Sequence, residues 1–391
     1  MNRKRNHVFI ILLLIIIFIL VGWNFSHDNV DIESIGAAQK SEVKVLTSLE
    51  QDQPSQEFKN GNESSGKEVI TDKILDCGKE AFEEEQIKLL KEFSDSKKLL
   101  SELKNKSSFS SKLAYIINNI STNANKAKTT EEIREYLTPF QELINLPDNP
   151  KLAHLLRLSQ CHLGGQGNQC SDKMISEAKE NNSSNAALWF QIAIIESSKG
   201  NSEQLIEALR HVISAPNFDS YWSDNMYSYN KSLEEIGISN NSTRMLLTIG
   251  MDAASQIAPF GKLLKFCSSQ SPVNAEVAEI CLAVGNRLFS SSKTFMHKSI
   301  GISLQKATYS ALEDKINLKK VSDSPWQSDT YTDEFFDALQ LAVFDQELAG
   351  YWFSQLQTFG EVKTNELLIE EAIRLSSDPD YNPCPVSEES E

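Results

Sequence analysis

The histidines are the residues of this chain best suited to acid–base or metal chemistry, because imidazole titrates near neutral pH. None of them falls in an H-E-x-x-H motif or in another pair on one helical face, the arrangement that holds a catalytic zinc ion. We interpret His211, which borders the apolar face of its expected helix, as a packing or surface residue. The histidines therefore predict no metal site. The six are His7, His27, His154, His162, His211 and His297.

Other catalytic templates also fail. Two Ser-x-x-Lys spacings, which begin at Ser94 and Ser290, lack the accompanying motifs of penicillin-binding enzymes. The glycines at 164–167 follow an expected helix and lie between two cysteines, whereas a phosphate-binding loop joins a strand to a helix. We therefore predict a protein that is not an enzyme and binds no cofactor. An envelope enzyme without a recognisable motif, or a sensor, stays as the alternative.

The cysteines favour disulfides. Their even number, all beyond the first seventy residues, is typical of an oxidising compartment. Six cysteines allow fifteen pairings. Short bridges that close helix–turn–helix corners are the simplest of these. A zinc site that uses Cys161 and His162 lacks a second short Cys/His pair. The predicted pairs are Cys161–Cys170 and Cys267–Cys281, which leaves Cys77 and Cys384 as a third.

A cluster of aromatic residues is the best sequence indication of a binding surface. It comprises Tyr221, Trp222, Tyr227 and Tyr229. Tyrosine and tryptophan are enriched at recognition surfaces. The cluster is predicted to contact a protein or peptide partner, together with the rest of residues 185–229. A buried junction between helices is the alternative.

The elements that must position these residues are helices, because strand patterns are nearly absent. Residues 185–216 form the clearest unit. Asn185 is expected to cap a helix that ends at Gly200, and Ser202 a second helix that ends before Pro216. Two short amphipathic helices joined by a tight turn cannot bury both apolar faces alone. We expect this hairpin to be one unit of a stack.

The hairpin resembles the tetratricopeptide repeat. Trp189, Ile192 and Ala193 match the opening of that motif, while Gly200 matches its turn and Leu209 its large second-helix residue. Spacing extends the resemblance over roughly 150–222, because Leu155, Leu158 and Ile175 each lie 34 residues before a matching position and Trp222 lies 33 after Trp189. The departures are Glu196, Leu205 and Pro216. The resemblance implies a concave helical scaffold for protein or peptide ligands. A generic helical hairpin is the alternative.

Further helices are expected on both sides of this region. Asn149-Pro150 is a helix start signal. The pattern over Ile70–Lys104 predicts two helices or one kinked helix with a break near Ser94. The remaining expected helices are Met245–Phe266, Val273–Phe289, Phe295–Leu312, Thr332–Phe359 and Glu361–Leu375.

The N-terminus predicts a membrane anchor. An unbroken apolar run from Val8 to Trp23 covers about 24 Å as a helix, close to the hydrocarbon thickness of a bilayer. No small-residue cleavage site follows the run at the required distance, so we expect residues 8–25 to be retained as a transmembrane signal anchor. Arg3, Lys4 and Arg5 precede the run and acidic residues follow it, which places the N-terminus in the cytoplasm.

The predicted protein is thus a single-pass protein of the inner (cytoplasmic) membrane with a periplasmic, all-α body. Its layout is a cytoplasmic tip at 1–7, the span at 8–25, a disordered linker at 26–68, a helical ectodomain of stacked antiparallel hairpins at 69–375 and a flexible acidic tail at 376–391. The net charge of −16, with basic residues clustered only at the tip, argues against nucleic acid and anionic lipid as partners of the ectodomain. The expected role is an adaptor that binds a protein or peptide in the cell envelope.

Overall fold

The computed structural model describes residues 73–92, 96–123, 130–161, 170–254, 260–323 and 329–385. The predicted tip, membrane span and linker lie outside these residues, as does the end of the predicted tail. None of the described helices has the length and apolarity needed to cross a bilayer. Residues 72–391 group into one compact unit.

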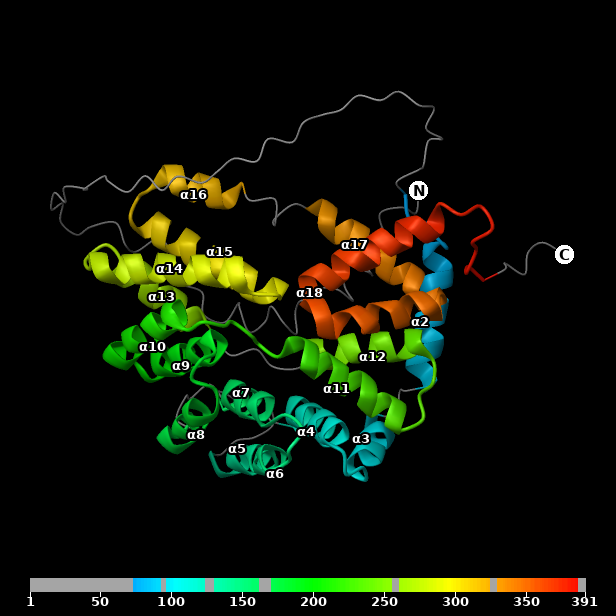
Figure 1. Cartoon of the computed structure of the whole chain (residues 1–391), viewed down its shortest axis with the longest axis horizontal. Coiled ribbons are helices and arrows are strands. Elements are labelled where there is room, and N and C mark those ends of the chain that lie inside the picture. The colour runs from blue at the N-terminus through cyan, green and yellow to red at the C-terminus, as the bar shows by residue number, and fades with distance from the viewer. Residues whose placement is uncertain are drawn as a thin grey trace. The chain divides into compact units, whose positions relative to one another are not determined.

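All regular secondary structure in the described ranges is α-helical, which confirms the predicted all-α class (Figure 1). Extended residues pair there only at an isolated parallel bridge between Asn185 and Asn217. The helices are α2 (Lys79–Glu92), α3 (Ser96–Lys104), α4 (Phe109–Asn123), α5 (Thr130–Leu137), α6 (Pro139–Ile144), α7 (Pro150–Gln160), α8 (Asp172–Asn182), α9 (Ala186–Lys199), α10 (Ser202–Ser214), α11 (Trp222–Glu235), α12 (Asn241–Ala254), α13 (Gly261–Gln270), α14 (Ala275–Ser291), α15 (Phe295–Ala311), α16 (Lys315–Ser322), α17 (Asp329–Phe344) and α18 (Gln346–Ser376).

Local capping chemistry fixes several helix ends. The Asn149 side chain accepts a hydrogen bond of 3.2 Å from the Leu152 amide, with Pro150 in the first turn of α7. The Asn185 side chain caps α9 in the same way. Gly200 ends α9 with a φ of 77°, a left-handed conformation that costs glycine little. These three signals confirm the predicted starts of α7 and α9 and the predicted turn at Gly200.

The predicted cap at Ser202 is wrong. Asn201 is the N-cap of α10, without a side-chain capping bond, because its side chain donates to Glu196 at 2.6 Å. Ser202 is the first helical residue.

We call the helices α9, α10, α13, α14 and α15 the hairpin block. Within it α10 packs on both α9 and α14, and α14 packs on α15. The backbones of α14 and α15 approach closely at Gly285 and Gly301: a Cβ atom at position 301 would lie only 2.6 Å from the Gly285 carbonyl oxygen. No larger residue fits at position 301 without separating the two helices, so these glycines set the spacing of the block.

A second region forms where α11, α12 and α18 contact one another, and we call it the polar junction. Helix α18 bends at Gly360, whose φ is 78° and ψ is 179°. Directly after the bend, the Val362 amide donates a 3.1 Å hydrogen bond to the Lys293 carbonyl in the turn between α14 and α15. The bend therefore joins the polar junction to the hairpin block.

Two of the predicted helices prove to be interrupted. The stripe Met245–Phe266 divides into α12, which ends at Ala254, and α13, which begins at Gly261. The stripe predicted over Thr332–Phe359 divides at Asp345, whose side chain accepts from the amides of Glu347 and Leu348 and so begins α18. In both cases the apolar periodicity continues across the break. Periodicity alone therefore missed the capping signal at Asp345.

The region predicted as stacked hairpins contains two adjacent hairpins, but the next helix, α11, packs elsewhere. Helix α7 packs on α8 and α9, and α10 packs on α9, in keeping with two adjacent hairpins. Helix α13 also packs on α9, whereas α11 packs on α4, α12 and α18. Trp222, the first residue of α11, is in register with Trp189 along the chain but belongs to the polar junction.

The three predicted disulfides are present. Cys161–Cys170 joins the end of α7 to the start of α8, and Cys267–Cys281 joins α13 to α14. Cys77–Cys384 spans 307 residues of sequence and ties the segment before α2 to the segment after α18. All the cysteines of the chain are paired in this way. The last bridge closes a long loop, the case in which chain entropy predicts the larger stabilisation.

Candidate partner-binding site

The predicted aromatic cluster does not form one surface. Tyr229 is fully buried, with an exposed fraction of 0%. This corrects its assignment as a partner-binding residue, because a buried side chain cannot touch a partner. Tyr227 is exposed, while Tyr221 and Trp222 are half-buried. The cause is helical geometry: positions 227 and 229 of α11 point in different directions, so only one of them reaches the surface.

Trp222 and Tyr221 are held by hydrogen bonds within the fold. The Trp222 indole Nε1 donates to a carboxylate oxygen of Asp252 at 2.9 Å. The Tyr221 hydroxyl lies 3.2 Å from the Asn182 side-chain oxygen, to which it donates. Each polar group is therefore engaged inside the protein. The two residues belong to a junction between helices, as the alternative interpretation expected.

Asp252 is an acidic residue of the polar junction that sequence reasoning missed. Its other carboxylate oxygen accepts from the Asn225 amide at 3.4 Å. Burial raises the pKa of Asp252 to about 6, against the opposing effect of its bonds from Trp222 and Asn225. A signal was present in the sequence, because an aspartate follows the apolar stretch Met245–Met251 of α12.

Glu361 is the second such acid. It follows the bend of α18, and its carboxylate accepts a 2.9 Å hydrogen bond from the Phe295 amide at the start of α15. Burial raises the pKa of Glu361 to about 8, and the negative charge of Asp252 raises it further. Glu361 therefore holds a proton at neutral pH, which allows an acid to remain between packed helices.

Several polar atoms in the junction have no hydrogen-bond partner among the described residues. They are Asn225 Oδ1, Tyr229 Oη, Thr248 Oγ1 and Thr364 Oγ1. Each belongs to a residue exposed by no more than 5%. Buried polar groups without a partner lower stability, by about 1–3 kcal/mol each. The junction is thus a destabilised, titratable region of the interior.

Two of the described histidines pack against aromatic rings. His211 stacks on Trp189, with ring centroids 3.9 Å apart. His297 packs edge-on against Phe190 and Phe218, and burial lowers its pKa to about 4. Within the described ranges, no three His, Cys, Asp or Glu residues come together in a way that could hold a metal ion.

An open groove lies between the α9–α10 turn and α13, with a volume of about 300 Å³. Leu205 forms part of its floor and is 1% exposed, while Phe266 is partly exposed at its side. Lys262 and Lys265 are both exposed on α13 and line the same groove. The groove therefore combines apolar contact area with positive charge on a chain whose net charge is −16.

The two groove lysines are available to a ligand. Lys262 Nζ donates to the Ser198 carbonyl at 3.3 Å, which holds the ammonium group at the rim. Neither Lys262 nor Lys265 forms an ion pair with any residue that the structure describes. By contrast, the neighbouring Lys199 is paired with Asp172 and Glu196. Sequence reasoning missed this site because α13 becomes a neighbour of α9 only in the folded chain.

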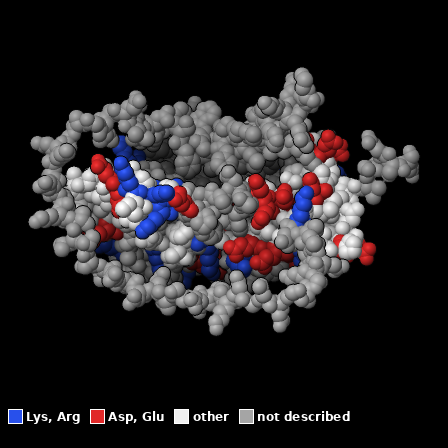
Figure 2. All heavy atoms as spheres, turned by 90° about the horizontal axis from the view of Figure 1, so that it is seen from above, with Lys and Arg blue, Asp and Glu red and all other residues white. Residues whose placement is uncertain are grey.

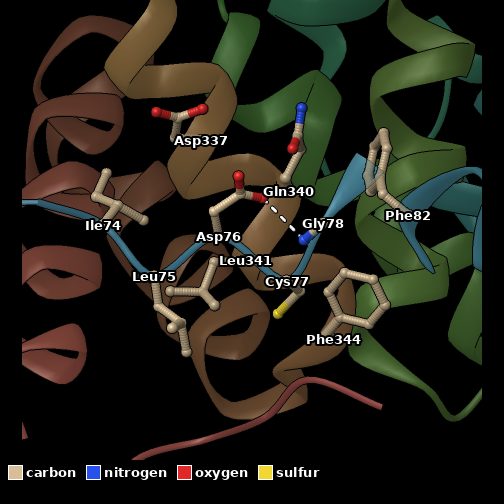
Figure 3. A pocket seen from close by; sticks show the side chains of 10 residues that line it. All are labelled: Ile74, Leu75, Asp76, Cys77, Gly78, Phe82, Asp337, Gln340, Leu341 and Phe344. Atoms are coloured by element: carbon tan, nitrogen blue, oxygen red, sulfur yellow. Dashed lines mark hydrogen bonds between the residues drawn. The ribbon is translucent and has the colours of Figure 1, made fainter. Parts of the chain in front are cut away.

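A second cavity, beside the Cys77 end of a disulfide, is too small for a ligand. Its volume is about 10 Å³, room for about one water molecule. Figure 3 shows the segment from Ile74 to Gly78 lying against Asp337, Gln340 and Leu341 of α17. The Asp76 carboxylate accepts from the Gly78 amide at 2.8 Å, which shapes the turn. This cavity is a feature of packing at the end of the disulfide.

Comparison with known protein families, with characterised proteins and with solved structures finds no match to this chain.

Proposed function

We propose that this protein is a membrane-anchored, extracytoplasmic helical scaffold that binds a protein or peptide partner. The observation that carries the proposal is the groove between the α9–α10 turn and α13, where Lys262 and Lys265 flank the apolar side chains of Leu205 and Phe266. Such a groove complements an extended or helical segment with acidic side chains and at least one apolar anchor. Binding, without catalysis, is the proposed activity.

Membrane attachment is proposed from the sequence. The apolar run at 8–25 has the length and flanking charges of a signal anchor with the N-terminus inside. Three disulfides are typical of an oxidising compartment, which supports an extracytoplasmic body. A stack of tetratricopeptide-like hairpins over 150–222 is the proposed scaffold. The adjacent pairs α7–α8 and α9–α10 support it, whereas the position of α11 limits it to two units.

The partner test uses charge reversal in the groove. The full chain, extracted from its native membrane in mild detergent, is purified as wild type, as Lys262→Glu/Lys265→Glu and as a matched control, Lys104→Glu/Lys106→Glu, at two exposed lysines at the end of α3 and just beyond it. We expect one defined protein to co-purify with wild type and with the control but not with the groove variant. Equal recovery by all three chains would remove the groove from the proposal.

Topology has a separate test. Alkaline phosphatase fused after Glu391 is expected to be active, because the enzyme folds only outside the cytoplasm. An inactive fusion together with a fluorescent cytoplasmic reporter at the same position would overturn the orientation.

A further inference from the structure

Helix α16 has one side on the protein and one side uncovered. It packs on α15, and none of its residues is buried. In Figure 1 it lies along the outside of α14 and α15. A helix of eight residues with so little contact is held weakly.

The uncovered side of α16 is basic and carries one large apolar residue. Lys315, Ile316, Lys319 and Lys320 share this side because they recur at helical spacing. All four are exposed, and Ile316 has an exposed fraction of 73%. Asn317, Leu318 and Val321 are less exposed and face the protein. The helix is thus amphipathic in an unusual sense, with cations and an isoleucine directed outward.

The positive charge on this side is local and not neutralised by ion pairs. None of the lysines of α16 forms a salt bridge with any described residue. Three acids lie at the ends of the helix, Glu313 and Asp314 before it and Asp323 after it, so the lysines of its outer side are the only charges between them. Asp314 caps the helix: its carboxylate accepts from the amide and side chain of Asn317, and its pKa is lowered chiefly by the Asn317 bonds. Figure 2 shows Lys and Arg gathered at the end of this face where α16 lies, and acidic side chains gathered toward the other end.

We propose that α16 contacts the surface of the membrane and binds anionic phospholipid head groups. Each lysine close to an anionic membrane surface raises the partition coefficient of the protein onto that surface by about fivefold. An exposed isoleucine between them fits the acyl boundary, and it has no role at a purely electrostatic surface such as nucleic acid. The inference rests on the membrane attachment in the proposed function. It departs from the expectation, drawn from total charge, that the ectodomain avoids anionic lipid, because the three lysines of α16 lie together on one side of the helix.

The test reads the environment of α16 itself in the full chain. Ile316→Cys introduces a single free thiol, because the native cysteines are paired, and an environment-sensitive dye is attached there. The chain is mixed with vesicles of phosphatidylcholine alone or of phosphatidylcholine with phosphatidylglycerol. A matched control carries the dye at Val273→Cys, which is 79% exposed in the turn between α13 and α14.

We expect the dye at position 316 to move to shorter wavelength only with phosphatidylglycerol present, and the dye at 273 to stay unchanged in both. Lys315→Glu/Lys319→Glu/Lys320→Glu is expected to reduce partition of the 316 dye about 100-fold or more. High salt should weaken the contact in the same direction, because it screens exposed charges.

Flotation of the same samples separates this inference from the anchor. If the chain floats with neutral vesicles but the 316 dye responds to neither lipid, the α16 contact is overturned and the anchor stands. If the chain floats only with anionic vesicles and the 316 dye responds, the anchor is overturned and the α16 contact stands. An equal response at 316 and 273 would also overturn the α16 contact. It would show that the ectodomain approaches the membrane with no preference for α16.

Discussion

Two tryptophans that lie 33 residues apart in the chain have opposite surroundings. Trp189, in the hairpin block, is 7% exposed, stacks on His211, and donates its indole N–H to the Ser183 carbonyl at 2.7 Å. Trp222, in the polar junction, is half-buried and donates to the carboxylate of Asp252. Trp189 thus lies in an apolar environment with its N–H bonded to backbone, whereas Trp222 lies beside Asp252, a buried acid with a raised pKa. Equal spacing in sequence therefore does not imply equal roles.

The largest effect should come from the tryptophans themselves. Trp189→Ala removes a buried ring together with its stacking contact to His211. We therefore expect the free energy of unfolding to fall by about 3–5 kcal/mol. Trp222→Ala removes a half-buried ring and one bond to Asp252, and should cost less, about 1–3 kcal/mol. Urea denaturation of the full chain, followed by far-ultraviolet circular dichroism, measures both. Equal losses would contradict the distinction between the two regions.

The pH dependence of stability should be specific to the junction. The pKa of Glu361 is raised from 4.5 to about 8, so its stabilising contribution is complete below 4.5 and is lost as pH rises through 8. Asp252, with a pKa near 6, acts mainly below pH 6.5. His297 acts in the opposite direction, because its folded pKa is lowered to about 4 and the unfolded imidazole loses its proton near pH 6.5, which offsets part of the Glu361 effect at that pH. Between pH 6.5 and 8 we expect unfolding free energy to fall, by at most about 1.4 kcal/mol per pH unit.

Glu361→Gln is the control for that titration, because the amide keeps the shape without the ionisation. Its unfolding free energy should be flatter between pH 6.5 and 8 than that of wild type. An identical slope in both proteins would assign the pH dependence to another group.

The smallest effect should have the opposite sign. Tyr229→Phe removes a buried hydroxyl that lies beside the Asn225 side chain but makes no well-formed hydrogen bond with it or with any other described residue. Removing such a group is expected to stabilise the fold by about 1 kcal/mol. The exposed Tyr227→Phe serves as a matched control, with an effect within about 0.5 kcal/mol. A loss of stability in Tyr229→Phe would indicate that the hydroxyl is bonded, for example to an ordered water.

The features that could be predicted from sequence are local ones. Asn149, Asn185 and Gly200 act within a few residues of themselves, so their roles follow from residue type and position. The short disulfides were predictable for the same reason. Trp222 and Tyr229 were not, because their roles depend on Asp252, which is far along the chain and on another helix.

The candidate binding groove could not be predicted from the sequence. The groove needs α13 to pack beside α9, and nothing in the pattern of either helix specifies that neighbour. Lys262 and Lys265 therefore had no functional meaning until the two helices were seen together. The α16 lysines were missed for another reason. The net charge of −16 is a sum over the whole chain and does not show that three lysines lie together on one helix.

Site-specific photo-crosslinking in living cells tests the proposed scaffold role most directly. A photoreactive amino acid is placed at Ser269, which lines the groove, or at Tyr227, which is exposed on α11 and outside it. We expect one discrete crosslinked partner at position 269, lost when Lys262→Glu/Lys265→Glu is added, and none at position 227. Crosslinking at 227 with none at 269, or a band at 269 unaffected by charge reversal, would contradict binding through the groove.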